Sequence, residues 1–407
     1  MLAKAHGVIG SGQVMSEARR VAARRTDGMR IIYLSISGLP SRAANSIHVM
    51  RMCEAFANNG HDVELLAPST GAEGATTTDL YRYYGVAGNF RITRIYRPTF
   101  RGGNYLYGVA AGLVARKRRV DLAYARYLPA GFWAAKFSVP LVYEAHVPVR
   151  LDGRISTNMF NNIVTSSRFK HLVVISDALK TFYRGKHGIA EKMITVARDA
   201  AGIPGRKTGI RPVDGRLRVG YVGHLYEGRG IDRIVNLSRR LPSIEFHIVG
   251  GTEPDIARWR QHTAQLSNVN VHGYVEPNRT AGILATLDIL LAPYQEHLSI
   301  SGGGANTSKW MSPIKIFEYM AAGRPIVCSR LPVLQEVLVD GRNSLLCDPS
   351  NEDEWEAAIL ELAGNRELQA TLARNAQAEV ENHYTWDIRA RKVLAGIMQN
   401  ALAPGPA

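Results

Sequence analysis

Two charged residues, Lys315 and Glu318, lie three positions apart in the segment Ser312–Val327 (SPIKIFEYMAAGRPIV). The pattern predicts a loop that turns into a helix over Ile314–Ala322, followed by a glycine stop and a buried strand. The N-terminus of such a helix presents unpaired N–H groups and a positive dipole end, which suit a phosphate. Lys315 adds a point charge there, and Glu318, on the same helix face, can accept two hydrogen bonds from a ribose diol. A surface ion pair is the alternative.

This segment resembles the donor-site signature of the retaining glycosyltransferases with the GT-B fold, family 4, in the subgroup with the pattern SPxKxxEYMAxGxPIV. The resemblance covers nearly the whole chain, from Met29 to the region of Trp386. It implies two Rossmann-like domains facing each other across a cleft, and a nucleotide-sugar donor. In that family the glutamate that matches Glu318 binds the ribose of the donor. In the same segment we expect Ser312 and Ile316 to contact the donor.

A second segment, Val222–Asp232 (VGHLYEGRGID), is similar to the family pattern GRLxxxKG, whose two basic residues hold the donor diphosphate. Arg229 takes the place of the lysine and keeps its charge, and Gly223 is expected beside the donor. His224 takes the place of the arginine, and a neutral imidazole cannot make the bidentate phosphate contact of a guanidinium. The alternatives are an exposed charge near a helix cap for Arg229 and a histidine satisfied within a turn for His224.

The first half of the chain offers candidates of its own. His146 comes just after the strand-like run Leu141–Tyr143, in the place of the family's histidine that faces the reacting sugar. A buried structural histidine is the alternative. The loop Ser37–Asn45 occupies the place of the family's glycine-rich first loop beside the diphosphate, although the paired glycines are missing. Its expected donor contacts are Gly38, Arg42 and Asn45.

Two short segments resemble other parts of the family's cleft. Gly273–Val275 is similar to the segment whose backbone reads the base of the donor, so Tyr274 and Val275 are expected there. Asp199 and Ala200 resemble an interdomain turn that contains an aspartate.

The chain also departs from the family pattern. The family often has a second glutamate eight positions before the ribose-binding one, and here that position is Trp310. The loop before it, Ser301–Ser308 (SGGGANTS), is flexible enough to close over a ligand. Its backbone and Asn306 are therefore the candidates for contacts to the sugar hydroxyls.

The elements that must position these residues alternate between strand-like and helix-like stretches. In the first half we predict strands at Arg30–Ser37, Val63–Ala67, Phe90–Ile95, Leu122–Ala125, Leu141–Tyr143 and His171–Ile175, and helices at Asn45–Asn59 and Leu106–Val114. In the second half we predict strands at Leu217–Val222, Glu245–Val249, Val269–His272, Ile289–Ala292 and Pro325–Cys328, and helices at Gly230–Arg240, Ala281–Ala285 and Ile314–Ala322. Such alternation predicts an α/β fold with two doubly wound parallel sheets. Ligands bind at the carboxyl ends of the strands in these sheets.

The predicted domain organisation has five parts. Residues 1–28 form a disordered leader, which makes Met29 a candidate start, and residues 29–205 form the acceptor-side domain. A polar linker at 206–216 leads to the nucleotide-sugar-binding domain at 217–385. Residues 386–407 form a last helix and a tail, and the helix is expected to pack back on the N-terminal domain.

The charge of the chain is unevenly distributed. The 407 residues carry a formal net charge of +15, of which residues 29–200 hold +12 and residues 201–407 hold none. A one-sided basic surface indicates an anionic partner such as a membrane face or a phosphorylated acceptor, and a basic protein without such a partner is the alternative. The three cysteines, in apolar contexts, are expected to be reduced thiols. No apolar run reaches the length of a membrane span. We therefore expect a cytoplasmic protein with peripheral contact to the inner face of the plasma membrane.

The sequence lacks Asp-x-Asp, HExxH, P-loop and nucleophile-elbow patterns, so we expect no metal, no cofactor and no nucleic-acid partner. The expected function is transfer of a sugar, of hexosyltransferase type, from a nucleotide sugar to a hydroxyl of a glycan or lipid-linked acceptor. Retention at the anomeric carbon follows from the resemblance, as does a role in cell-surface glycan or polysaccharide biosynthesis. Two alternatives stay open: a non-catalytic GT-B protein that binds a nucleotide sugar or a partner transferase, and a nucleotide-sugar epimerase.

Overall fold

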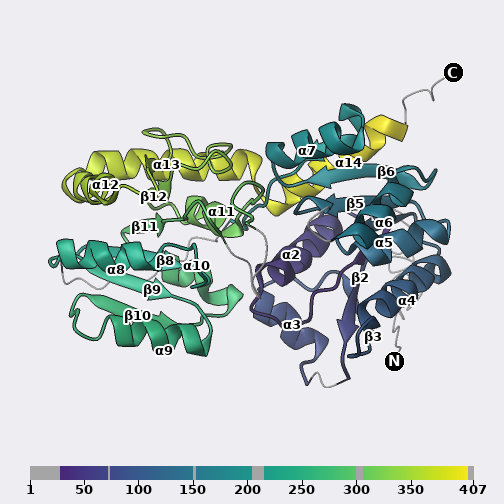
Figure 1. Cartoon of the computed structure of the whole chain (residues 1–407), viewed down its shortest axis with the longest axis horizontal. Helices are drawn as coiled ribbons and strands as arrows, with labels where there is room; N and C mark the ends of the chain where they lie inside the picture. The colour runs from purple at the N-terminus through teal and green to yellow at the C-terminus, as the bar shows by residue number, and fades with distance from the viewer. Residues whose placement is uncertain (1–27, 72–73, 150–152, 204–214, 299–305, 402–407) are drawn as a thin grey trace, which may run out of the picture.

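A computed structural model describes residues 28–71, 74–149, 153–203, 215–298 and 306–401. They form two α/β domains that lie side by side (Figure 1). Almost all of the predicted leader, most of the predicted linker and the tail after residue 401 lie outside the described residues.

The N-terminal domain is built on seven parallel strands in the order β3-β2-β1-β4-β5-β6-β7. The strands are Arg30–Leu34 (β1), Asp62–Ser69 (β2), Arg91–Tyr96 (β3), Leu122–Ala125 (β4), Leu141–Ala145 (β5), Phe169–Val174 (β6) and Ile194–Val196 (β7). The helices are Ala44–Asn58 (α2), Thr77–Tyr84 (α3), Gly103–Arg118 (α4), Leu128–Lys136 (α5), Arg154–Val164 (α6), Asp177–His187 (α7) and a 3-10 turn at Glu191–Met193 (η2). Every residue of β4 and β5 is buried, because helices cover both faces of the sheet.

The C-terminal domain repeats this plan with six parallel strands in the order β10-β9-β8-β11-β12-β13. The strands are Arg218–Val222 (β8), Glu245–Val249 (β9), Val269–Gly273 (β10), Ile289–Ala292 (β11), Ile326–Ser329 (β12) and Leu345–Cys347 (β13). The helical elements are Ile231–Arg240 (α8), Glu253–His262 (α9), Pro277–Arg279 (η3), Thr280–Leu284 (α10), Ile314–Ala321 (α11), Glu352–Gly364 (α12) and Arg366–His383 (α13). In each sheet the first strand is central and the chain winds outward to both edges, which is the doubly wound arrangement. The predicted fold class is confirmed.

The last helix, Trp386–Ala401 (α14), returns to the N-terminal domain. The hydroxyl oxygen of Thr385 accepts a hydrogen bond from the N–H of Ile388 at 3.2 Å and caps the helix. The yellow helix in Figure 1 lies among the teal elements of the other domain, where it packs on α2, β6 and β7. Trp386 and Val393 belong to the hydrophobic core of the N-terminal domain.

Among the described residues, no helix combines the length and the apolar character that a membrane span requires. All three cysteines are buried and carry free thiols.

Candidate active site in the interdomain cleft

A cavity of about 350 Å³ lies between the two domains. Its walls come from segments that follow β4, β5, β7, β8, β9, β10 and β11, so it lies at the carboxyl ends of both sheets. Most of the predicted site residues line it: Arg42, Asn45, His146, Gly223, His224, Arg229, Tyr274, Val275, Ser312, Lys315 and Glu318.

Three expected donor contacts are absent from the lining of this cavity. Gly38 lies in the loop after β1, and its Cα faces open space. Ile316 is buried in the core of the C-terminal domain, because it lies on the face of α11 that packs away from the cleft. Asn306 uses its amide to brace its own loop, through bonds of 2.8–3.0 Å to the backbone of Glu296, Leu298 and Ser308. Residues 301–305 of that predicted closing loop lie outside the described residues.

Two cations lie together on the C-terminal side of the cavity. Lys315, in the first turn of α11, places its Nζ 3.8 Å from the ring centroid of Tyr221 and 4.7 Å from that of Tyr294. This Nζ is buried, and no hydrogen-bond acceptor in the described part of the chain reaches it. Arg229 lies over Tyr294 as well, with its Cζ 5.4 Å from the ring centroid. Burial, together with the charge of Arg229, holds the pKa of Lys315 well below its ordinary value.

Glycines allow the backbone to approach these cations. A Cβ on Gly223 would lie 3.1 Å from the Nζ of Lys315. Gly250 follows β9 with φ +119°, and a Cβ there would lie 2.0 Å from the carbonyl oxygen of Gly223. The end of β9 therefore reaches the end of β8 only because Gly250 lacks a side chain, and the missing side chain of Gly223 leaves room for Lys315. The result is a candidate anion site formed by two cations, the N-terminus of α11 and a bare backbone.

Glu318 lies one turn after Lys315 and also lines the cavity. Burial raises the pKa of its carboxyl group above the ordinary value. Within the described residues the carboxyl has no hydrogen bond or ion pair, so its oxygens are available to a ligand. A carboxylate in this place can accept hydrogen bonds from neighbouring hydroxyls.

His224 contributes no positive charge to this anion site. Its ring stacks on Tyr226, with ring centroids 4.8 Å apart and 7° between the planes. Burial and the charges of Arg229 and Lys315 lower the pKa of His224 to about 4. The histidine that replaces the family's arginine is therefore a neutral group at physiological pH.

Arg42 and Tyr274 close the cavity from opposite domains. The Cζ of Arg42, in the segment before α2, lies 4.3 Å from the ring centroid of Tyr274, which follows β10. Arg42 Nη1 also lies 3.7 Å from Glu253 Oε1 on α9. The hydroxyl of Tyr274 is hydrogen bonded to that of Tyr83, again from the other domain. These contacts lie at the wall of the cavity where the resemblance predicts the base of the donor.

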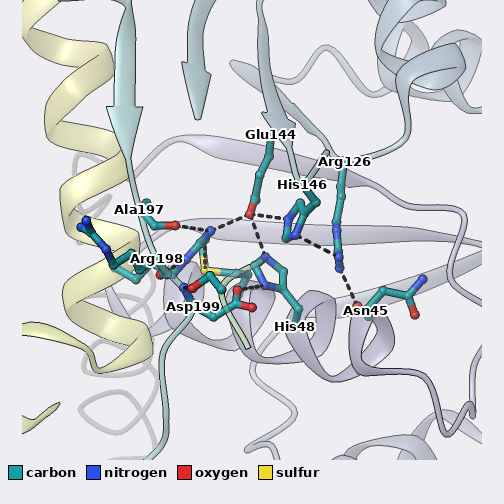
Figure 2. Close-up of polar contacts among 11 residues, drawn as sticks. Asn45, His48, Arg126, Glu144, His146, Ala197, Arg198 and Asp199 are labelled. Atoms are coloured by element: carbon teal, nitrogen blue, oxygen red, sulfur yellow. Dashed lines mark hydrogen bonds and ion pairs between the residues drawn. The ribbon is translucent and has the colours of Figure 1, made fainter. Parts of the chain in front are cut away.

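His146, just after β5, faces the cavity from the N-terminal domain (Figure 2). Its Nε2 lies 2.9 Å from Glu144 Oε1, and its Nδ1 lies 3.2 Å from Arg126 Nη2. A carboxylate only accepts and a guanidinium only donates, so these neighbours select the neutral tautomer with hydrogen on Nε2. Burial and the charge of Arg126 lower the pKa of His146 to about 4. The imidazole facing the cavity is therefore neutral.

Several residues that line the cavity were not predicted from the sequence. Arg126 follows β4 as His146 follows β5, and it donates from Nη1 to the carbonyl oxygen of Asn45 at 3.0 Å. Its position at a strand end was a signal available from the sequence. His48 lies inside α2, where nothing in the sequence distinguishes it from a core residue. Gly250 and Gly251 were visible as a glycine pair after a strand, the pattern that brings backbone close to a ligand.

Trp310, in the place of the missing glutamate, lies outside the cavity lining. Its ring packs against Phe182 of α7 with a centroid distance of 5.9 Å, and its carbonyl oxygen accepts a hydrogen bond from the Ser176 hydroxyl at 3.1 Å. The residue therefore contributes to contact between the domains. No other side chain of the described residues brings a second carboxylate beside Glu318 into the C-terminal wall of the cavity.

One cluster beside the cavity has the composition of a metal site. His48, Glu144 and His146 offer ligand atoms within 4.8 Å of one another. However, the Glu144 oxygen that both histidines approach also accepts a hydrogen bond from Arg389 Nη2 at 2.6 Å. A guanidinium on the same oxygen opposes a second cation there. The three residues fit an internal hydrogen-bond network better than a metal centre.

Two family models match the chain in succession. The model of Glycosyltransferase Family 4 matches residues 46–198, and the model of Glycosyl transferases group 1 matches residues 216–365. Each match lies within one of the two domains, and together they include the segments that form the cavity.

Curated relatives are similar over shorter regions. An uncharacterised glycosyltransferase of Methanocaldococcus jannaschii is 25% identical over 177 residues, which span 42% of this chain and 42% of that protein. A phosphatidyl-myo-inositol mannosyltransferase of Mycolicibacterium smegmatis is 27% identical over 159 residues, or 39% of this chain and 37% of that protein. The chain thus matches less than half the length of each of these relatives.

Solved structures share the fold over almost the whole chain. HepE of Anabaena, in complex with UDP and glucose, superposes with a TM-score of 0.69 and 18% identity over 91% of this chain and 99% of that one. Sucrose-phosphate synthase of Thermosynechococcus elongatus superposes with a TM-score of 0.72 and 16% identity over 92% of this chain and 100% of that one. Given both family models, glycosyltransferase relatives and this two-domain architecture, the chain belongs to the GT-B glycosyltransferases.

Proposed function

We propose that the chain transfers a sugar from a nucleotide-sugar donor, bound at the C-terminal wall of the cavity, to an acceptor hydroxyl, with retention of the anomeric configuration. The observation that carries this proposal is the pair Arg229 and Lys315, two cations in the cavity wall without a carboxylate partner among the described residues. A buried cation without a partner is costly, so a site that keeps two of them is suited to a polyanion such as a diphosphate.

The same groups suit the departure of a nucleoside diphosphate. Negative charge develops on the leaving diphosphate, and fixed cations and a helix N-terminus placed there stabilise that charge without reorganisation. Arg229, Lys315 and the start of α11 fill this role. Glu318 holds the ribose hydroxyls, and the wall at Tyr274 and Val275 receives the base. HepE, a neighbour with this fold, was crystallised with UDP and glucose, which supports a nucleotide sugar as the donor class.

His146 then lies on the side of the cavity where the sugar and the acceptor meet. Positive charge develops on the anomeric carbon as the donor bond breaks, and a cationic imidazole beside it would oppose this step. The low pKa of His146, about 4, keeps the ring neutral at working pH. We propose that His146 orients the sugar, and that the acceptor hydroxyl enters past Asn45 and Arg126. The acceptor would be a glycan or a lipid-linked molecule of cell-surface glycan or polysaccharide biosynthesis.

A panel of UDP-, GDP- and ADP-sugars tests the proposal. We expect one donor to release its nucleoside diphosphate, faster with an acceptor present, and to do so in EDTA because Arg229 and Lys315 supply the positive charge. Lys315→Met serves as the inactive control. Binding of a nucleotide without release of diphosphate across the panel would favour the non-catalytic alternative. That alternative is kept because His224 and Trp310 depart from the family pattern. Activity that disappears on chelation and returns with manganese would contradict the metal-free mechanism.

We further propose that the N-terminal domain docks on an anionic membrane face. Among the tyrosines and arginines of residues 81–119, Tyr84 and Tyr107 lie in the core, whereas Arg82, Tyr96 and Arg101 are exposed. The exposed apolar residues of β3, α4 and the segment between them are Tyr96, Phe100, Tyr105, Leu106 and Leu113. The exposed cations beside them are Arg101 and Arg116–Arg119. We call this set the β3–α4 patch. Figure 1 places β3 and α4 at the side of the N-terminal domain away from the other domain. Aromatic and basic residues in one patch suit the interface between water and lipid.

A further inference from the structure

Arg389 is a buried arginine on α14, the helix that follows the C-terminal domain and docks on the N-terminal one. Its exposed fraction is 3%, and every nitrogen of its guanidinium has a partner. Nη2 donates to Glu144 Oε1 at 2.6 Å and to the carbonyl oxygen of Ala197 at 3.0 Å. Nε donates to the carbonyl oxygen of Arg198 at 2.9 Å, and Nη1 lies 3.0 Å from the sulfur of Met52. The guanidinium is therefore fixed by β5, α2 and the segment after β7.

Arg389 contacts the Glu144 carboxylate, and Figure 2 shows His48 and His146 beside that same carboxylate. Its Oε1 lies 2.6 Å from Arg389 Nη2, 2.9 Å from His146 Nε2 and 3.0 Å from His48 Nε2. Burial alone would raise the pKa of Glu144, but Arg389 and His48 hold it well below the ordinary value. Glu144 is 1% exposed, so without Arg389 it would be a buried carboxylate with no guanidinium in contact with it.

The same network reaches the donor side of the cavity. His48 Nδ1 lies 2.7 Å from Asp199 Oδ1, and the backbone N–H of Asp199 donates to the Ser312 hydroxyl at 2.8 Å. Ser312 begins the loop that leads into α11 and Lys315. Through the hydrogen bonds of this network, Arg389 is thus connected both to His146 in the N-terminal domain and to the loop at Ser312 in the C-terminal domain.

We propose that Arg389 is a positioning residue of the active site, which acts through Glu144 to hold His146 in the Nε2–H tautomer. The C-terminal helix α14 thereby completes a site whose walls come from both domains. The contribution of His146 to sugar transfer rests on the proposed function, whereas its tautomer does not. The guanidinium compensates the buried charge of Glu144 and fixes its position, and the ionised carboxylate, together with Arg126 at Nδ1, directs the hydrogen of His146 to Nε2.

Loss of Arg389 should change the pH at which His146 becomes protonated, and the direction of the change follows from the charges around it. The groups that face Glu144 and His146 are His48 on α2, Tyr33 on β1, Tyr124 on β4, Arg126 after β4, Asp199 after β7 and Arg389 on α14. Arg389 and Arg126 are the two guanidinium groups in this set. Without Arg389, a carboxylate would be left in a low-dielectric site with less positive charge beside it, and proton uptake by the imidazoles restores the balance. His146 should then become protonated at higher pH than in the wild type.

Nitrogen NMR of histidine-labelled protein tests the proposal without any substrate. The wild-type protein should show His146, assigned through His146→Gln, as the Nε2–H tautomer at neutral pH. In Arg389→Met the His146 resonances should titrate at higher pH, and Arg389→Lys should give a smaller shift in the same direction. The matched control is Arg391→Met, an exposed arginine two positions along α14. An Nδ1–H tautomer in the wild type would overturn the proposal, and that measurement requires no variant to fold. Unchanged His146 resonances in a folded Arg389→Met variant would overturn it as well.

Turnover separates positioning from a structural role once a donor is known. Arg389→Met should lower kcat about 100-fold with little change in donor KM, since donor contacts stay in place while the reacting groups are misplaced. The acid limb of its kcat profile should also move to higher pH, and Arg389→Lys should recover part of both. Loss of folded protein would lower kcat without moving the pH profile, and that result would contradict positioning. If the wild type transfers no sugar, the proposed function fails while the tautomer measurement still decides this inference.

Discussion

Lys315 Nζ lies 3.8 Å from the ring centroid of Tyr221, on an aromatic face and without an acceptor among the described residues. An aromatic face stabilises an ammonium group by about 0.5–2 kcal/mol, which is less than the loss of hydration on burial. Lys315 is therefore a group that the unliganded protein holds at a cost in stability. Binding of an anion would remove that cost.

Replacing Lys315 with methionine should stabilise the unliganded protein by about 1–3 kcal/mol while weakening the binding of UDP, GDP or ADP at least tenfold. The lowered pKa means that the unfolded chain binds more protons than the folded chain between the folded-state pKa and 10.5. The wild type should therefore become more stable as the pH rises through that window, and Lys315→Met should lose this rise. Thermal unfolding at neutral and alkaline pH measures both effects.

Lys309→Met, at an exposed position nearby, serves as the control and should change neither property. If Lys315→Met proved less stable than the wild type and still bound the nucleotide tightly, Lys315 would be a structural residue and the anion site would lie elsewhere.

The acid side of the stability profile should be steep. Burial lowers the pKa of His146, His171 and His224 to about 4 from 6.5. The unfolded chain therefore binds more protons between these values, so stability is fully present above the unfolded pKa and falls as the pH drops toward 4. Each histidine contributes at most roughly 3 kcal/mol to this loss. Urea unfolding across this pH range measures the slope.

His224→Gln should flatten that slope, because the glutamine has no proton to take up. The exposed histidine His262, on α9, gives the matched control His262→Gln. A slope that is equal in the wild type and in His224→Gln would show that burial does not lower the pKa of His224, which would contradict the expectation.

Glu318→Gln should raise the dissociation constant of the bound nucleoside diphosphate tenfold or more and leave the fold intact. A hydrogen bond to a charged group contributes about 1.5–3 kcal/mol, and the carboxyl of Glu318 has no protein partner among the described residues that the substitution would disturb. Calorimetry with UDP, GDP and ADP measures the change, with Glu361→Gln on α12 as the control. Equal affinities for wild type and variant would remove Glu318 from the ribose site.

The strand pattern was accessible from the sequence because parallel strands covered on both faces read as short apolar runs. Leu122–Ala125 and Ile289–Ala292 were predicted with the bounds that the structure shows. The helix α7, in contrast, carries the sequence DALKTFYRGKH, in which only Leu179 and Tyr183 are buried. Two buried positions give too weak a periodicity to indicate a helix without the sheet beneath it. Helices α3, α5, α6 and α9 and the edge strands β7 and β13 were missed as well.

The residues of the candidate site also fall into those that could be predicted from the sequence and those that could not. Lys315, Glu318 and Arg229 could be found because one helix turn or one strand-to-helix loop fixes their neighbourhood. Ile316 was expected at the donor, whereas its side chain packs in the core, because a sequence pattern does not say which face of α11 packs on the core. The network of His48, Glu144 and Arg389 joins three segments far apart in sequence, so no local pattern could reveal it. A buried arginine on an amphipathic helix reads as a surface charge until its partner is seen.

Membrane docking through the β3–α4 patch gives the last prediction. The protein should bind vesicles that contain anionic lipid but not neutral vesicles, and salt should weaken binding, because exposed cations each contribute about 1 kcal/mol near such a surface. Arg116→Ala with Lys117→Ala removes two charges and should weaken partition by about 30-fold. Phe100→Ser with Leu106→Ser removes exposed apolar contacts, at 62% and 51% exposure, and should weaken binding to anionic vesicles at high salt as well as low.

Leu360→Ser is the matched control for this patch, because Leu360 is also exposed but lies on α12 of the other domain. Co-sedimentation of the four proteins with both kinds of vesicle, at low and high salt, gives the comparison. If the control loses as much binding as the Phe100 and Leu106 variant, the attachment is not specific to the β3–α4 patch. Equal sedimentation with anionic and neutral vesicles, or with neither, would refute docking on an anionic membrane. The positive charge of the N-terminal domain would then be interpreted as a binding surface for an anionic acceptor in solution.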